Sequence, residues 1–349
     1  MKELDTLIEL AVKEGASDLH ISENRVPYLR IFGQLVPLSK YPKFTRASME
    51  NILEKTLSNL KKEIFKNVQS ADLAYSHNGE RFRVHTFLDQ QKICMTFRRI
   101  SNQVPTVEEL DLPEVLKNFA RLKAGFFLVV GPTGHGKSTT LASLIDIINT
   151  ERLENIITIE DPVEYLFTPK KSVIFQREVG SDTPSFSVAL RDCFRADINV
   201  IMVGEMRDAE TMATAVSAAE TGHLVFSTLH TNNAAQTVDR IIDSFEPAQQ
   251  NQIRIQLAAS LSGIFSQRLV PRISGGLVPV YELLINNTAV SNLIRDRRTH
   301  ELNTIIETSS GEGMIDFNRC LVNRVNKGEI SIENAYLYST NPKSLEKML

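Results

Sequence analysis

The spacing of apolar residues in the first hundred positions predicts a small α+β domain. Apolar residues recur three or four apart from Leu4 to Ala11 and Gly15 follows as a stop, so an amphipathic helix should open the chain. Asn78-Gly79 lies between two strand-like runs and predicts a tight hairpin, because a primed turn needs positive φ at both central residues. A second helix is expected over residues 49–68, and strands over 18–21, 28–32, 35–38, 71–76, 81–88 and 92–100.

From Gly125 onward the pattern becomes an alternation of apolar runs and helical periods. Strands are predicted over 126–131, 155–160, 200–205 and 224–229, and helices over 137–150, 185–195, 208–220 and 234–245. Nearly continuous apolar strands that alternate with helices indicate an α/β fold, in which helices cover both faces of a parallel sheet. From Gln249 the chain is expected to be mostly helical, apart from a strand or hairpin over 277–284.

Residues 101–112 hold Pro105 and several acids without periodicity, which suits a linker, and Pro113 then starts a short helix. The predicted organisation is therefore an amino-terminal domain over 1–100, a linker over 101–122 and a larger α/β domain over 123–349.

Composition and charge narrow the class of protein. The 349 residues are 42% hydrophobic and 23% charged, which excludes a mainly disordered chain, and the formal net charge of -3 gives no general attraction to nucleic acid. Cys94, Cys193 and Cys320 lie too far apart in sequence for a zinc knuckle or a redox pair, so we expect reduced thiols and no zinc. The start lacks a secretory signal and no apolar run nears the ~20 residues that cross a bilayer, so a cytoplasmic location is expected.

The most specific feature is a phosphate-binding P-loop between a predicted strand and a predicted helix. Its glycines let backbone N–H groups point at a polyphosphate, Lys137 reaches the outer phosphates, and the Ser138 hydroxyl ligates Mg²⁺. A chance glycine-rich turn is the alternative, but the motif is complete and its context fits. His135 fills a variable position, so its imidazole is expected to be incidental. The expected nucleotide-binding residues are Gly131, Pro132, Thr133, Gly134, His135, Gly136, Lys137, Ser138 and Thr139.

Two acidic clusters follow predicted strands at the edge where parallel sheets bind ligands. One is Glu160-Asp161-Pro162-Val163-Glu164, and the other is Gly204-Glu205. Hydrolysis of a nucleotide needs one carboxylate to hold hydrated Mg²⁺ and another to orient or deprotonate water, and these clusters can supply both. The alternative is that Asp161-Pro162 is only a turn and Glu205 only a helix-capping acid.

Histidines and arginines complete the set of candidates. His223 and His230 bracket a predicted strand and, seven residues apart, should point to opposite faces, so only one of them is expected to meet the nucleotide. The same geometry argues against a metal site made by the pair. Four arginines are candidates for stabilising charge on a transferring phosphate, with solvated surface residues as the alternative. They are Arg191 and Arg195, expected on one helix face, and Arg83 and Arg98, on strands of the first domain.

Four ordered segments resemble the motifs of the secretion-superfamily ATPases, most closely the PilT and PilU type of pilus retraction ATPase. GPTGHGKSTT resembles their Walker A motif, IEDPVEY their Asp box, VIMVGEMRDAET their Walker B motif and AETGHLVFSTLHTNNA their His box. The resemblance implies a PAS-like amino-terminal domain joined to a RecA-like ATPase domain. It also implies a ring of six subunits, with nucleotide bound between the two domains.

The resemblance also implies roles for individual residues. Lys137 and Ser138 would be the nucleotide and Mg²⁺ residues, Glu164 would activate water, and Glu205 would be the Walker B acid. Glu160 would join Ser138 and Glu205 around the metal. The remaining family positions around the phosphates are matched by His223, His230, Arg83, Arg98, Arg191 and Arg195. Which of Glu164 and Glu205 activates water stays open at this point.

Sequence features outside the four motifs indicate which branch of the family, assembly or retraction, the chain resembles. Pilus assembly ATPases usually carry an extra amino-terminal domain and a tetracysteine zinc segment, and the absence of both favours the retraction branch. Ser291 stands where the PilT retraction signature has an arginine, and the ending GEISIENAYLYSTNPKSLEKML is more similar to the accessory paralogue PilU. Sole retraction and an accessory role therefore both remain open.

The hypothesis from sequence is a hexameric, Mg²⁺-dependent ATP hydrolase that retracts type IV pili and drives twitching motility. Its expected partners are an inner-membrane platform protein, which would hold it at the membrane, and a paralogous retraction ATPase. A nucleic-acid translocase is an alternative, but the one concentrated basic run, Arg295 to Arg298, is short and broken by Asp296. A nucleotide-sensing adaptor with little turnover is the other alternative.

Overall fold

The computed structural model describes residues 2–31, 33–100 and 103–349, and the chain divides into two compact units. The first unit contains Met1–Gln103 together with two later segments, Glu160–Phe167 and Arg177–Ser185. The second unit contains Val104–Ile159, Thr168–Gln176 and Phe186–Leu349. Two segments of the later chain thus cluster with the amino-terminal residues.

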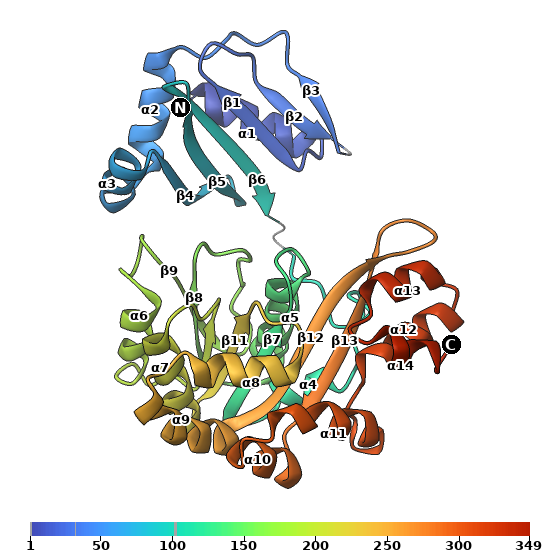
Figure 1. Cartoon of the computed structure of the whole chain (residues 1–349). Helices are drawn as coiled ribbons and strands as arrows, with labels where there is room; N and C mark the ends of the chain where they lie inside the picture. The colour runs from blue at the N-terminus through green and yellow to red at the C-terminus, as the bar shows by residue number, and fades with distance from the viewer. Residues whose placement is uncertain (1, 32, 101–102) are drawn as a thin grey trace. The chain divides into compact units, whose positions relative to one another are not determined.

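The first unit is built on an antiparallel sheet that, within the described residues, has six strands in the order β3-β2-β1-β6-β5-β4. The apolar stripe from Leu4 to Ala11 is buried on α1 as predicted, and the Asn78-Gly79 hairpin is confirmed with φ values of 49° and 79°. Figure 1 shows α1 and α2 packed against this sheet. The elements are α1 (Lys2–Lys13), β1 (Asp18–Ser22), β2 (Tyr28–Ile31), β3 (Gln34–Pro37), α2 (Arg46–Thr56), α3 (Asn59–Val68), β4 (Ser70–His77), β5 (Glu80–Asp89) and β6 (Lys92–Ile100).

The single helix predicted over 49–68 is wrong, because the chain forms α2 and α3 with a break between them. Leu57 leaves the helical region, and the Ser58 side chain accepts a hydrogen bond from the Lys61 N–H as the N-cap of α3. A serine that caps a new helix competes with continuation of the old one. Phe32 of the predicted strand 28–32, and Ser101 and Asn102 of the predicted linker, lie outside the described residues.

The second unit is built on a mostly parallel sheet with seven strands in the described chain, in the order β13-β12-β7-β11-β10-β8-β9. Its central pairs β12-β7, β7-β11, β11-β10 and β10-β8 are parallel, and β13 is antiparallel to β12. Every residue of β7 and β11 is buried, which explains the continuous apolar runs. The strands are β7 (Gly125–Val130), β8 (Asn155–Glu160), β9 (Val173–Glu178), β10 (Val200–Val203), β11 (Leu224–Leu229), β12 (Leu261–Pro271) and β13 (Leu277–Ile285).

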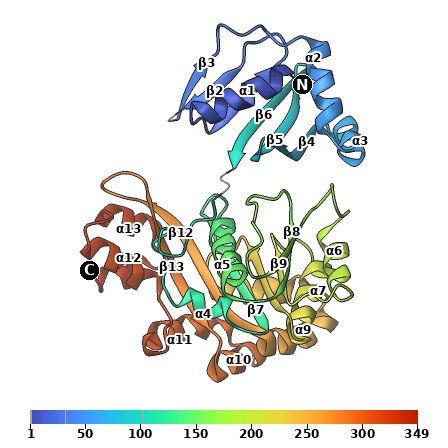
Figure 2. The same ribbon diagram turned by 180° about the vertical axis from the view of Figure 1, so that it is seen from behind.

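Helices cover both faces of this sheet, as the alternation predicted. Helices α7, α8 and α9 lie on the face seen in Figure 1, and α4 and α5 lie on the opposite face in Figure 2. The helices around the sheet are α4 (Leu116–Ala120), α5 (Lys137–Glu151), α6 (Phe186–Cys193), α7 (Ala209–Glu220), α8 (Ala234–Asp243) and α9 (Pro247–Ser260). None of the helices in the described ranges is both long and apolar enough to cross a membrane.

Two strands of this sheet were not predicted. β9 was not singled out, and β12 lies in a region that was expected to be helical. Ile253, Leu257, Leu261, Ile264 and Phe265 keep a helical spacing straight through the boundary between α9 and β12. β12 is paired on both sides, with β7 and β13, and most of its residues are buried, so it has no alternation to reveal a strand.

The carboxyl-terminal residues form a small helical cluster on the β12-β13 pair. Val270, Val278 and Val280 of the strands pack with Phe317 and Leu321 of α12 in one core. Cys320 is buried there and Cys193 is buried on α6, and both are free thiols, as is the partly buried Cys94. The helices of this region are α10 (Thr288–Arg295), α11 (Leu302–Thr308), α12 (Phe317–Asn326), α13 (Ile332–Tyr338) and α14 (Pro342–Glu346), with short 3₁₀ turns at Thr299–Glu301 and Ser310–Glu312.

Candidate functional site

The P-loop connects β7 to α5 at the carboxyl edge of the parallel strands. Gly131, Gly134 and Gly136 have φ values of 145°, 80° and 79°, a region that side-chain-bearing residues rarely adopt. Gly131 also lies against β12, where a Cβ atom would come within 2.2 Å of the Gln267 carbonyl oxygen. The turn predicted from sequence is therefore required by both the backbone conformation and the strand behind it.

Lys137, His230 and Glu205 form a network beside this loop. Lys137 is buried, and its Nζ donates to the carbonyl oxygens of Gly131 at 2.8 Å and Pro132 at 2.9 Å. The same Nζ lies 3.4 Å from His230 Nδ1, and His230 Nε2 lies 3.3 Å from Glu205 Oε2. Since a carboxylate only accepts, the imidazole proton belongs on Nε2, and Nδ1 then faces Lys137 as an acceptor. The predicted residues of three separate motifs thus meet at one point.

Glu205 follows β10 and is held ionised by two hydrogen-bond donors, Arg207 and His230. Burial raises the pKa of this carboxyl group, but hydrogen bonds and charge from Arg207 and His230 outweigh burial, so its pKa lies below the ordinary value. Arg207 Nη2 donates to Glu205 Oε1. Sequence reasoning did not single out Arg207, although a cation two residues beyond a candidate acid is a usable signal.

Gln267 of β12 is a second site residue that sequence reasoning missed. The same strand also shows that the prediction for His135 is wrong. The buried Gln267 carboxamide accepts a hydrogen bond from Thr140 Oγ1 at 2.7 Å and donates to the His135 carbonyl oxygen at 2.9 Å. The His135 imidazole is not incidental, because its Nδ1 accepts a hydrogen bond from the Leu269 N–H at 2.8 Å. These contacts exist only because β12 is a strand, and the helical spacing of its apolar residues gives no signal for them.

The Asp-box acids are arranged within the first unit. Glu160, the last residue of β8, is buried, and one of its carboxylate oxygens accepts a hydrogen bond from the Glu164 N–H at 3.2 Å. Glu164 is partly exposed, and its Oε1 lies 3.9 Å from Arg83 Nη1. A closer pair, missed from sequence, joins Arg81 Nη2 to the buried Glu178 Oε2 at 2.9 Å, and that oxygen also accepts from the Val163 N–H. Arg81 and Glu178 thus hold the backbone that carries Glu164.

The other three candidate arginines are exposed. Arg98 pairs with Asp18 at 2.9 Å, and Arg191 pairs with Glu210 at 2.9 Å. The prediction that Arg191 and Arg195 share a helix face is wrong, because α6 ends at Cys193 and Arg195 lies in the following turn. Their roles at a phosphate stay predictions.

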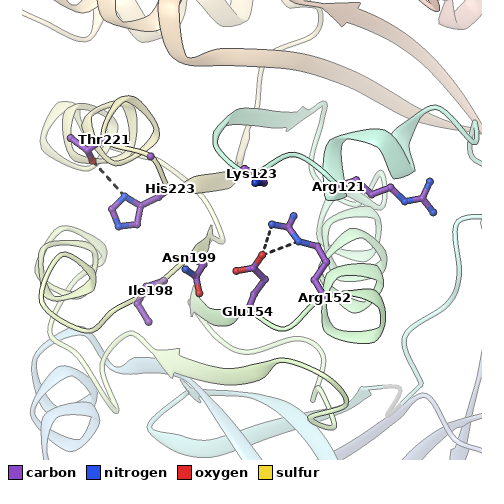
Figure 3. Close-up of a pocket in the computed structure, with 9 residues that line it drawn as sticks. Arg121, Lys123, Arg152, Glu154, Ile198, Asn199, Thr221 and His223 are labelled. Carbon is purple, nitrogen blue, oxygen red and sulfur yellow. Dashed lines mark hydrogen bonds and ion pairs between the residues drawn. The ribbon is translucent and has the colours of Figure 1, made fainter.

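His223 lies at the opposite edge of the sheet from His230. It precedes β11, whereas His230 follows it, and its Nδ1 donates to the Ala218 carbonyl oxygen at 3.0 Å. Figure 3 shows His223 beside Thr221 at one side of a cavity of about 580 Å³, with the Arg152–Glu154 ion pair at the other. The whole length of β11 therefore separates the two histidines. If only one of them meets the nucleotide, as expected from sequence, it is His230, which lies beside the P-loop.

The two histidines make a matched test. We expect His230→Ala to lower kcat for ATP hydrolysis about tenfold or more, because it removes a side chain that contacts both Lys137 and Glu205. His223→Ala is expected to change kcat less than about twofold in the same phosphate-release assay, since it alters only the amino edge of the sheet. Equal losses in both variants would contradict this division.

The arrangement fits a polyphosphate ligand and an oxygen-ligated cation. The helix α5 begins at the loop, so backbone N–H groups and the partial positive charge of the helix meet there. Ser138 is exposed on the first turn of α5, and Glu205 is an ionised carboxylate at the same edge. In the described ranges, no group of three or more His, Cys, Asp or Glu side chains is placed to hold a metal. Mg²⁺ does not need one, because it usually keeps several waters and binds substrate phosphates.

Comparison with known proteins also indicates a nucleotide-binding protein, and the matches cover nearly the whole chain. Residues 1–276 match the family described as "Type II/IV secretion system protein". The chain is 40% identical to the type IV pilus retraction ATPase PilT of Pseudomonas aeruginosa, over 95% of this chain and 97% of that protein. It is 39% identical to the type IV pilus ATPase PilU of the same organism, over 99% of this chain and 91% of that protein. A crystal structure of the pilus retraction motor PilT with bound ADP matches with a TM-score of 0.90 and 42% identity, over 98% of both chains.

Proposed function

Because the chain belongs to the type II/IV secretion system protein family and is an ATPase of the PilT and PilU type, we propose that it is a motor for the retraction of type IV pili. ATP hydrolysis would supply the work that draws pilin subunits back into the inner membrane. The observation that carries the proposal is the meeting of Lys137, His230 and Glu205 beside the P-loop, in a chain that matches PilT along almost its full length.

The residues have distinct proposed tasks in hydrolysis. The N–H groups of the P-loop and the Lys137 ammonium group hold the phosphates, and His230 keeps Lys137 and Glu205 in position through its two ring nitrogens. Glu164 orients and deprotonates the attacking water. Arg83, Arg98, Arg191 and Arg195 are proposed to stabilise negative charge on the phosphates, within one subunit or across a subunit boundary. His223, at the amino edge of the sheet, is proposed to have a structural role with little effect on turnover.

Mg²⁺ is the proposed metal, held by oxygens of Ser138, Glu160 and Glu205 together with water and phosphate. It would neutralise charge on the phosphate oxygens. The ionised state of Glu205 and the exposure of Ser138 support this set. In the same proposal the protein forms a homohexamer in the cytoplasm and reaches the inner membrane through the pilus platform protein.

Deletion of the gene in its host tests the proposed function. We expect excess surface pili and loss of twitching, because pili would still be assembled but not withdrawn. Complementation with the wild-type gene should restore both traits, and the Lys137→Ala gene should restore neither, although its protein accumulates. Pili and twitching that stay at wild-type levels would overturn both the primary proposal and its accessory variant.

An accessory role is the second candidate, favoured by the alignment with PilU over 99% of the chain. A PilU-like protein would assist a separate PilT-like motor. Deletion would then leave pilus numbers near normal and reduce twitching only in part. Deleting only the paralogous retraction ATPase, in a strain that keeps this gene, separates the cases, since a sole motor would retain full retraction in that background.

A further inference from the structure

Two residues of β12, Gln267 and Leu269, make direct hydrogen bonds to the P-loop and to the first turn of α5. Gln267 Nε2 donates to the His135 carbonyl oxygen at 2.9 Å, and Gln267 Oε1 accepts from Thr140 Oγ1 at 2.7 Å. The Leu269 N–H donates to His135 Nδ1 at 2.8 Å. The loop is therefore fastened to the strand behind it at both the backbone and the side chain of His135.

The backbone contact sets the direction of a phosphate-facing N–H group. In a trans peptide the carbonyl and the following N–H point in opposite directions. Because the His135 carbonyl points at Gln267, the Gly136 N–H points away from β12. Gly136 lies close to the strand, since a Cβ atom there would be 3.0 Å from Gln267 Nε2. Rotation of this peptide would remove an N–H from the set that can meet a phosphate.

The side-chain contact requires a neutral imidazole. The N–H of Leu269 is a donor, so His135 Nδ1 has to be an acceptor and the proton belongs on Nε2. Burial lowers the pKa of His135, and the positive charges of Arg268 and Lys137 lower it further, which favours this neutral form. Both cations that face the ring thus support the same hydrogen bond.

The strand that holds the loop is itself anchored. Arg268 donates to the Tyr338 carbonyl oxygen at 3.0 Å and lies over the Phe317 ring, 5.3 Å from its centroid. Its Nη2 lies 3.3 Å from Asn232 Oδ1, in the turn that follows His230. The attachment point for His135 is therefore fixed by the carboxyl-terminal helical cluster and by the turn after β11.

We propose that His135 is a positioning residue for nucleotide binding: its Nδ1, held by the Leu269 N–H, keeps the P-loop in the conformation that receives the phosphates. The P-loop motif does not require a histidine at this position, so the role belongs to this chain's own sequence. The inference concerns ATP binding and hydrolysis alone and is independent of what the motor moves.

His135→Ala and His135→Asn test the proposal in full-length protein. The alanine variant lacks the acceptor, whereas asparagine has Oδ1 the same number of bonds from Cα as Nδ1 of histidine. Since a net hydrogen bond changes an equilibrium by several-fold, we expect His135→Ala to raise the KM for ATP and the Kd for ADP about fivefold. The value of kcat should stay within about twofold, because the loop binds ground state and transition state alike. His135→Asn should restore both constants to within about twofold of wild type.

Steady-state phosphate release and calorimetric titration with ADP measure these constants, and the urea midpoint of each variant serves as the stability control. An alanine variant with wild-type KM and Kd overturns the proposal. So does an asparagine variant no better than alanine when both have the same urea midpoint, because a purely steric role would then suffice. If His135→Ala does not fold, His135→Asn decides the matter by the same two constants.

Discussion

Replacing Lys137 with alanine is expected to lower kcat for ATP hydrolysis by about 100- to 1,000-fold, the effect of removing one preorganised donor from a developing charge. Lys137 is buried and its Nζ is held by two P-loop carbonyls and by His230, so no other described side chain takes this position in the network. Phosphate release under saturating ATP and Mg²⁺ measures the change. A variant that keeps more than about a tenth of wild-type turnover contradicts the assignment.

Lys123→Ala is the matched control for that experiment. Lys123 is an exposed lysine just before β7, at the opposite end of the strand that leads into the P-loop. The substitution removes one positive charge from the second unit, as Lys137→Ala does, but it leaves the P-loop unchanged. We expect turnover within about twofold of wild type, as is usual for an exposed surface substitution.

Glu164→Gln and Glu205→Gln should separate the base from the metal ligand. We expect Glu164→Gln to lower kcat about 100-fold or more while ATP affinity stays within about twofold, because an amide cannot accept the proton from water. Glu205→Gln should instead raise the Mg²⁺ concentration needed for half-maximal activity, because it removes a carboxylate that is ionised beside His230 and Arg207. Mg²⁺ titrations of phosphate release, with binding of a fluorescent ATP analogue, distinguish the two effects.

The control for this pair is Glu210→Gln, which changes an exposed acid on α7 that pairs with Arg191 of α6. Its kcat and Mg²⁺ requirement should match those of the wild type, because the Glu210–Arg191 pair is exposed at the surface. The opposite result for the two test variants, with Glu205→Gln abolishing turnover at any Mg²⁺ concentration and Glu164→Gln shifting only the Mg²⁺ requirement, would exchange the two roles.

The parts of the fold that sequence predicted well are those with a local physical cause. The glycines of the P-loop, the Asn78-Gly79 turn and the apolar runs of β7 and β11 each specify a conformation within a few residues. The bounds of β6, β8 and β11 agree with the predicted ranges for the same reason. Local signals were sufficient to place Lys137 and Glu205 at one edge of a parallel sheet, whereas sequence left open which of His223 and His230 lies with them.

The errors come from features that depend on distant partners. β12 keeps a helical spacing of apolar residues and becomes a strand only because β7 and β13 lie on either side of it. Missing that strand also hid Gln267 and the acceptor role of His135. Arg81 was not among the candidate residues, because its partner, Glu178, ends a strand that was not predicted. The PAS-like character of the amino-terminal domain and the roles of Glu164 and the four arginines stay predictions.

The backbone of β12 behind Gly131 has a consequence for the evolution of related sequences. A Cβ atom at this position would collide with the backbone of β12, 2.2 Å from the Gln267 carbonyl oxygen, whether or not a phosphate is ever bound. A descendant that abandoned catalysis and served only as a scaffold would be free to discard Lys137, yet this glycine would still be kept by the need to fold. An intact Gly131 in a distant homologue is therefore no sign that the homologue hydrolyses ATP.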